Sequence, residues 1–304
     1  MDSLSEVIAA SEQTVSQPAS AAAATHAPAA THAQPTVTHI LLLAGWAGTV
    51  LVMGRRNQWF NNPRVVRWRV NTYGNLLLCL CGLAIAPMVG SIVGSLAGAN
   101  ANEVSTPHSV LGSMAASGSL TLFMWWWLWN RHATHEPCNA MPASHAAIMG
   151  AVGLAAIWPW MVLISHTGEW LHTLGGGTPA PDIAHSTLQL LMANSRSISA
   201  WMIGLLVVTL TPITEEILWR GAAQQWLKSV GLPRGIAIAV TALLFALVHW
   251  GAVPADARFS ALPALLALGI ALGWLMERTG NLIAPIAAHA AFNAVNLLLF
   301  SMLP

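Results

Sequence analysis

Residues 211–226 read TPITEEILWRGAAQQW, and this otherwise apolar stretch contains three charged side chains, Glu215, Glu216 and Arg220. It lies within a hydrophobic run of residues 197–227 that is long enough to cross a bilayer as a helix. A charge near the centre of a bilayer costs about 2.5–3.5 kcal/mol on insertion scales, so such residues are candidates for function. The alternative is that the span ends before the charges and leaves them in water.

The composition points to the same apolar environment for the rest of the chain. Of the 304 residues, 55% are hydrophobic and only 8% are charged, whereas soluble domains carry about 25% charged residues. A formal net charge of +1 offers no basic stripe for nucleic acid. The sequence therefore predicts an all-α, polytopic transmembrane helical bundle that is surrounded by the lipid bilayer and has no nucleic-acid partner. The expected location is a bacterial inner membrane, with a multi-pass topology.

Apolar runs predict about eight spans, with a polar tail before the first. The runs cover approximately residues 39–53, 73–97, 108–129, 144–164, 197–227, 235–253, 262–276 and 282–303. Residues 1–37 are mainly Ala, Ser, Thr, Pro and His without an apolar period, which is typical of a disordered tail. Arg residues that follow the first run, and Lys228, Arg234 and Arg278 further on, place their loops in the cytoplasm by the positive-inside rule.

Three of the runs bring polar side chains to a similar depth. If the fifth run reaches the cytoplasm near Lys228, Glu215 lies thirteen residues away, or about 20 Å at 1.5 Å per residue. By the same measure, His249 lies about 21 Å into the next run, and His289 lies about 16 Å beyond the loop that holds Arg278. A span that ended before the charges would instead put Glu215 and His249 at opposite surfaces. The matched depths favour one intramembrane site.

Helical spacing assigns these side chains to faces. Glu216 and Arg220 are four residues apart, so they share a face and are expected to form an ion pair that offsets the burial of both charges. Glu215 is turned by about 100° from Glu216 and can point into a cavity. His289 and Asn293 are also four residues apart and can reach the same small volume.

Other residues nearby are expected to support the site. Phe245 precedes His249 by one turn and is interpreted as a packing wall. Asn296 lies on the same face of the last run as the polar pair there, as a further hydrogen-bond donor. Pro212 lies three residues before Glu215, where it would free a backbone carbonyl and kink the helix beside the site.

Together these side chains suit the activation of water against a carbonyl. Glu215 is the candidate general base, His249 would bind or orient the water, and His289 and Asn293 would donate hydrogen bonds to the developing oxyanion. A metal is the alternative, because Glu215, His249 and His289 would give two imidazoles and one carboxylate around Zn²⁺ with an open position. The metal-free form is preferred because no two of these ligands lie on one helix. No cofactor is predicted beyond this candidate zinc.

Three short motifs follow one another on the last apolar runs. They are EExxxR (Glu215, Glu216 and Arg220, followed by Gly221), FxxxH (Phe245 and His249) and HxxxN (His289 and Asn293). In these motifs the chain resembles the CPBP (ABI) family, the CAAX proteases and bacteriocin-processing enzymes that include the type II CAAX prenyl endopeptidases. The resemblance implies a helical catalytic core in residues 197–304, preceded by transmembrane helices in residues 38–196 and the tail in residues 1–37.

The resemblance also implies an activity. It is that of an intramembrane endopeptidase that cuts near the C-terminus of a prenylated protein or a membrane-associated peptide precursor. Members of the family are described both as metalloproteases and as glutamate-type enzymes. The implied roles are water activation by Glu215 and His249, an oxyanion site at His289 and Asn293, and structural support by Glu216 and Arg220.

Two other classes of function are alternatives at this point. A catalytically idle immunity or scaffold protein would keep the same site for stability alone. A proton-coupled transporter would also bury Glu and His, but its charged residues would form a chain across the membrane and not one cluster.

Overall fold

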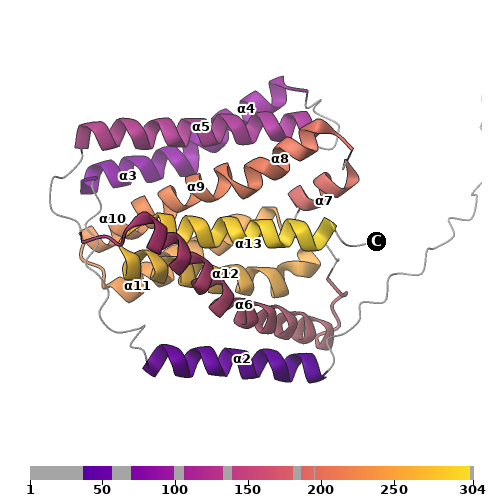
Figure 1. Ribbon diagram of the computed structural model, residues 1–304. Helices are drawn as coiled ribbons and strands as arrows, with labels where there is room; N and C mark the ends of the chain where they lie inside the picture. Colours follow the sequence, from indigo (N-terminus) through magenta and orange to yellow (C-terminus); the bar gives the residue numbers. More distant parts are fainter. Residues whose placement is uncertain are drawn as a thin grey trace, which may run out of the picture. The chain divides into compact units, whose positions relative to one another are not determined.

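The computed structural model describes residues 37–56, 70–98, 106–132, 139–180, 186–194 and 196–301, and the described part of each apolar run lies mainly on helical structure (Figure 1). This confirms the all-α bundle. The predicted disordered tail lies outside the described residues, except for Val37, where the first described helix begins. In chain order, the helical elements are α2 (Val37–Arg56), α3 (Thr72–Leu80), η1 (Cys81–Ile85), α4 (Ala86–Leu96), α5 (Pro107–His132), α6 (Ala143–Leu174), α7 (Ser186–Ala193), α8 (Ile198–Val208), α9 (Leu210–Glu216), η2 (Ile217–Ala223), α10 (Gln224–Ser229), α11 (Arg234–Val248), η3 (His249–Gly251), η4 (Ala255–Ala257), α12 (Arg258–Thr279) and α13 (Ile283–Ser301).

Within the described residues, five helical segments are long and apolar enough to cross a membrane. They are Thr72–Leu96, Ala143–Leu174, Ile198–Ser229, Arg234–Gly251 and Ala255–Thr279. Between 22% and 39% of the most apolar window of each segment is buried inside the protein, so most of these side chains face outward, as lipid contact requires. The chain is an integral, multi-pass membrane protein.

Other helices have an apolar character without reaching the same length or hydropathy. The apolar part of α13, Ile283–Leu299, is shorter than the five spans. Helix α5 has 26 residues, but its Ser, Gly and Trp residues lower its mean hydropathy. The count of about eight spans therefore stays a prediction.

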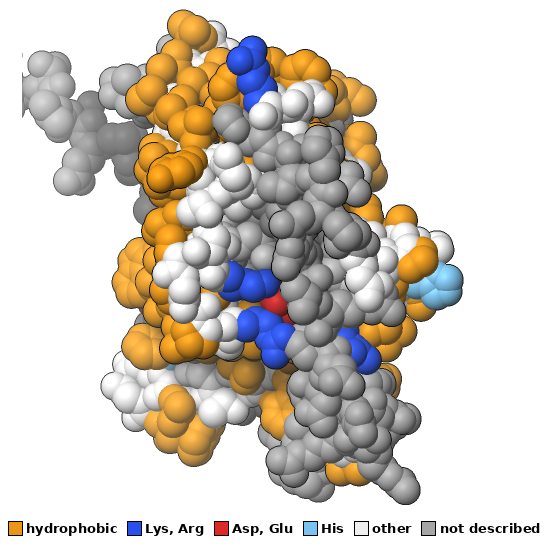
Figure 2. Space-filling view, turned by 90° about the vertical axis from the view of Figure 1, so that its left-hand side faces the viewer, with side chains coloured by type: hydrophobic (Ala, Val, Ile, Leu, Met, Phe, Trp, Pro, Cys, Tyr) orange, Lys and Arg blue, Asp and Glu red, His pale blue; other side chains and the backbone are white. Residues whose placement is uncertain are grey.

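Basic side chains gather at the end of the bundle where α10, α11 and α12 meet. Figure 2 shows Lys and Arg side chains around an acidic group on this end, with hydrophobic side chains on its flanks. Lys228 of α10 lies 2.8 Å from Glu277 of α12, Arg234 begins α11, and Arg278 lies in the last turn of α12. The positive-inside rule predicted that all three lie on the cytoplasmic side, and the structure has them at the same end of the bundle.

The helices that carry polar residues into the membrane are held by close packing. Helix α6 packs against both α12 and α13. Its Gly150 permits the approach to α13, since a Cβ at this position would overlap the carbonyl oxygen of Ala284. On the other side, η2 packs against α3, and Leu78, Trp219 and Phe245 belong to one buried cluster. Residues His39–Pro304 form one unit, and the predicted division at residue 196 stays a prediction.

Candidate active site

The helix that carries Glu215 and Glu216 is irregular on both sides of the two carboxylates. Helix α8 ends at Val208, and α9 begins at Leu210 after Thr209, whose backbone (φ −113°, ψ −70°) departs from regular helix. The expected kink near Pro212 is thus an interruption three residues before that proline. Directly after Glu216 the helix widens to the π-helical segment η2, a feature that recurs at functional sites. The two carboxylates therefore lie on a short segment between two irregularities.

Glu216 and Arg220 form the ion pair that their spacing predicted. Arg220 Nη1 donates to Glu216 Oε1 at 2.9 Å, and both side chains have no exposed surface. The guanidinium has two further partners: Nη2 donates to the carbonyl oxygen of Gly269 on α12 at 3.0 Å, and its carbon lies 4.7 Å from the centre of the Phe245 ring. Arg220 thereby ties the first helix of the site to α11 and α12.

His289 lies between the two carboxylates. Its Nδ1 is 2.8 Å from Glu216 Oε1, and its Nε2 is 3.8 Å from Glu215 Oε2. The His289 side chain is 5% exposed, whereas the Glu215 side chain is 26% exposed. Glu215 is therefore the carboxylate that water can reach, and Glu216 is enclosed behind the ring.

His249 approaches the same region from the end of α11. Its Nδ1 lies 2.7 Å from the carbonyl oxygen of Phe245, one turn earlier, which directs the Nε2 edge of the ring away from its own helix. The buried Phe245 ring lies between the two imidazoles, with centroid distances of 5.0 Å to His249 and 5.8 Å to His289. Phe245 thus separates the two histidines and packs against both.

The side-chain amides of the two asparagines of α13 donate hydrogen bonds to backbone carbonyl oxygens. Asn293 Nδ2 donates to the carbonyl oxygen of Val207 at 2.8 Å, beside the interruption of the helix at Thr209. Asn296 Nδ2 donates to the carbonyl oxygen of Phe292 at 2.9 Å on its own helix. A side-chain amide has two N–H donors, so Asn293 keeps one donor beyond its bond to Val207.

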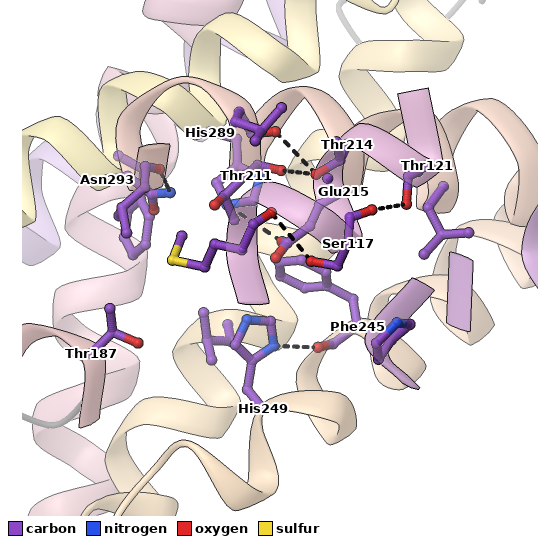
Figure 3. Close-up of a pocket in the computed structure, with 18 of the residues that line it drawn as sticks. Ser117, Thr121, Thr187, Thr211, Thr214, Glu215, Phe245, His249, His289 and Asn293 are labelled. Carbon is purple, nitrogen blue, oxygen red and sulfur yellow. Dashed lines mark hydrogen bonds and ion pairs between the residues drawn. The ribbon is translucent and has the colours of Figure 1, made fainter. Parts of the chain in front are cut away.

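Glu215, His249, His289 and Asn293 all line one cavity of about 520 Å³ (Figure 3). Asn296 and Phe245 line it as well, whereas Glu216 and Arg220 are buried behind its wall. The structure therefore brings together, from three different helices, the three side chains that were predicted at a similar depth and Asn293, which was predicted to share a face with His289.

Part of the chain is similar to a known protein family. Residues 197–295 match the family described as Type II CAAX prenyl endopeptidase Rce1-like. These residues form an Rce1-like CAAX endopeptidase domain. Comparison of the chain with curated proteins and with solved structures gave no match. The matched residues include every side chain of the three motifs, from Glu215 to Asn293.

The cavity of the CAAX endopeptidase domain is completed by helices outside the matched residues. Helix α5 contributes Ser117 and Thr121, and α7 contributes Thr187. Thr211 and Thr214, within the domain, add two more hydroxyls to the wall (Figure 3). Sequence reasoning missed all five, because a hydroxyl in an apolar helix is common and the pattern in one helix does not show which cavity it faces.

The candidate zinc set does not fit a metal in this arrangement of the CAAX endopeptidase domain. Among the residues that the structure describes, no three His, Cys, Asp or Glu side chains are placed to ligate one ion.

Proposed function

We propose that this chain is an intramembrane endopeptidase that hydrolyses a peptide bond near the C-terminus of a prenylated protein or a membrane-associated peptide precursor. The observation that carries the proposal is the meeting of Glu215, His249, His289 and Asn293 on the wall of one cavity inside a CAAX endopeptidase domain. A membrane-embedded cavity suits a substrate that is itself held at the membrane.

In the proposed reaction, Glu215 is the general base. Its carboxylate, the more exposed of the pair, takes a proton from a water molecule whose oxygen then bonds to the scissile carbonyl carbon. His249 orients this water with the ring edge that faces away from the Phe245 carbonyl. When the tetrahedral intermediate breaks down, the C–N bond breaks and Glu215 returns the proton to the leaving amine. One water is consumed, and an acid and an amine are released.

The negative charge that develops on the carbonyl oxygen needs hydrogen-bond donors. Asn293 has a second N–H besides the one given to Val207, and His289 donates from Nε2 when that atom also carries a proton. Donors aimed at the place where charge develops are among the largest contributions to catalysis.

The side chains that line the cavity can bind a peptide substrate. Thr121 Oγ1 donates to the carbonyl oxygen of Ser117 at 3.0 Å, and Thr214 Oγ1 donates to that of Leu210 at 3.0 Å. Hydroxyls that donate to their own helix keep lone pairs for the N–H groups of a bound peptide. The apolar lining includes Met114 and Leu265, which suit aliphatic side chains or a lipid chain.

The direct test is the variant Glu215→Gln in purified full-length protein. With an internally quenched peptide that ends in a prenylated Cys followed by three residues, we expect kcat to fall by at least about 10²-fold, because the amide cannot take the proton. Cleavage of the peptide is followed by fluorescence, and folding is checked by thermal unfolding. Wild-type cleavage by the folded variant would refute the proposed function, and flux of protons into vesicles that depends on Glu215 would favour a transporter.

The proposed reaction uses no metal, so removal of metal ions by a chelator should not change the activity. Protein dialysed against a strong chelator should retain its kcat with the same peptide. Elemental analysis of the purified protein gives the zinc content before and after dialysis. Loss of one equivalent of zinc together with activity would show that Glu215, His249 and His289 bind a metal after all.

A further inference from the structure

Glu216 does more than neutralise Arg220, because its carboxylate also contacts His289. One oxygen, Oε1, accepts hydrogen bonds from Arg220 Nη1 at 2.9 Å and from His289 Nδ1 at 2.8 Å. The other oxygen, Oε2, is buried and has no hydrogen-bond partner among the described residues. If Glu216 served Arg220 alone, the usual arrangement would be a fork in which both oxygens face the guanidinium. Here the carboxylate is turned so that one oxygen reaches the histidine.

Arg220 fixes the carboxylate in this orientation. Its second terminal nitrogen is used by the Gly269 carbonyl on α12, so only Nη1 is directed to Glu216. Gly269 brings α12 close to α11, since a Cβ there would lie 3.0 Å from Ala242. The position of Glu216 Oε1 is thus determined by contacts on α11 and α12 and not by its own helix alone.

The contact with Glu216 also determines how the His289 ring is presented. An ionised carboxylate can only accept, so Nδ1 carries the hydrogen of this bond. The ring is then held with its Nε2 edge toward Glu215, at 3.8 Å, and toward the cavity. Phe245 closes one side of the ring in an edge-on contact, at 5.8 Å between centroids. The orientation of the ring and the proton on Nδ1 are therefore fixed, and Nε2 donates to the oxyanion when it carries the second proton of an imidazolium ring.

We infer that Glu216 is a positioning residue of the reaction: through its hydrogen bond to Nδ1 it orients His289 so that Nε2 faces the reacting groups. The inference rests on the proposed endopeptidase function and deepens it. The two neighbouring carboxylates then have different roles: Glu215 acts on the water, and Glu216 acts through the histidine. The same logic, a carboxylate that sets the orientation and tautomer of a catalytic histidine, operates in the Ser-His-Asp triad.

The substitution Glu216→Gln tests the inference. The amide oxygen of the new side chain can still take the place of Oε1 between Arg220 and Nδ1, but the substitution removes the negative charge that holds the proton on Nδ1 and stabilises a protonated ring. With the quenched prenylated peptide, we expect kcat to fall about 10-fold or more while KM changes less than about twofold, as for a lost histidine orienter. The matched control is Glu277→Gln, a buried carboxylate that bonds Lys228 and Gln224 and does not line the cavity. A purely structural role predicts the same change in kcat for both variants.

A double-mutant cycle with His289→Gln shows whether Glu216 acts through the histidine. In the His289→Gln background, Glu216→Gln should lower kcat by less than about twofold further, because contacting residues are coupled. If Glu216→Gln retains wild-type kcat, or lowers kcat by the same factor in both backgrounds, the inference is overturned. The proposed endopeptidase function still holds in that case if Glu215→Gln is inactive in the same experiment.

A second variant covers the case in which Glu216→Gln does not fold. The double substitution Glu216→Leu and Arg220→Leu removes both buried charges at once, a kind of change that is often neutral for stability. The folded double variant should still show the loss in kcat with little change in KM, because Nδ1 has lost its acceptor. Wild-type kcat in this variant would overturn the inference.

Discussion

At the scale of the residue, one carboxylate oxygen connects two parts of the site. Glu216 Oε1 accepts from Arg220 on its own helix and from His289 on α13. Sequence spacing predicted the first contact, because residues four apart share a helical face. It could not predict the second, since two adjacent carboxylates at the same depth give no sign of which one a different helix will meet.

The burial of Arg220 leads to a stability prediction for its partner. Glu216→Ala leaves a guanidinium without exposed surface and without its counter-charge, so the free energy of unfolding should fall by about 3–5 kcal/mol. Thermal unfolding in detergent micelles measures the change. The control is Glu277→Ala: its partner Lys228 has a side chain that is 23% exposed and can turn toward water, so the loss should be smaller. Equal losses in the two variants would contradict this account of Arg220.

At the scale of the element, the long apolar helices could be predicted, whereas the short helix α7 and the interruptions of the long helices could not. An apolar segment in a bilayer satisfies its backbone groups by forming a helix, so each run became one. Pro212 indicated a kink, and the interruption lies at Thr209. No local signal indicated the π-helical segment η2 or the 3₁₀ turn η3 that begins at His249, because both depend on contacts with other helices.

The contact of α6 with α13 gives an element-scale prediction. Gly150→Ala places a Cβ against the Ala284 carbonyl, so α13 must shift and the free energy of unfolding should fall by about 1–3 kcal/mol. Because α13 carries His289 and Asn293, the rate of peptide cleavage should fall as well. Gly235→Ala on α11 is the matched control: nothing lies within 4 Å of a Cβ there, and helix propensity favours Ala by up to about 1 kcal/mol. Thermal unfolding and the cleavage assay should separate the two variants; if both behave alike, close packing at Gly150 is not what positions α13.

At the scale of the whole molecule, the site is shared between the matched domain and the helices before it. Glu215, His249, His289 and Asn293 were predictable because a polar group deep in an apolar run stands out in the sequence. Ser117 and Thr121 of α5 line the same cavity from outside residues 197–295. They could not be predicted, since the packing of α5 against α8 and α9 is a long-range property that periodicity within α5 does not reveal.

The basic residues at the end of the bundle where α10, α11 and α12 meet predict the orientation of the chain. Lys228, Arg234 and Arg278 lie where α10, the start of α11 and the end of α12 meet, so the positive-inside rule places this end in the cytoplasm. In protein whose three native Cys are replaced by Ala, Ser229→Cys next to this end should react with a membrane-impermeant maleimide only after the membrane is opened. Asp256→Cys, exposed in the turn between α11 and α12 at the other end, should react in intact bacterial cells. The opposite pattern would invert the topology and place the turn after His249 in the cytoplasm.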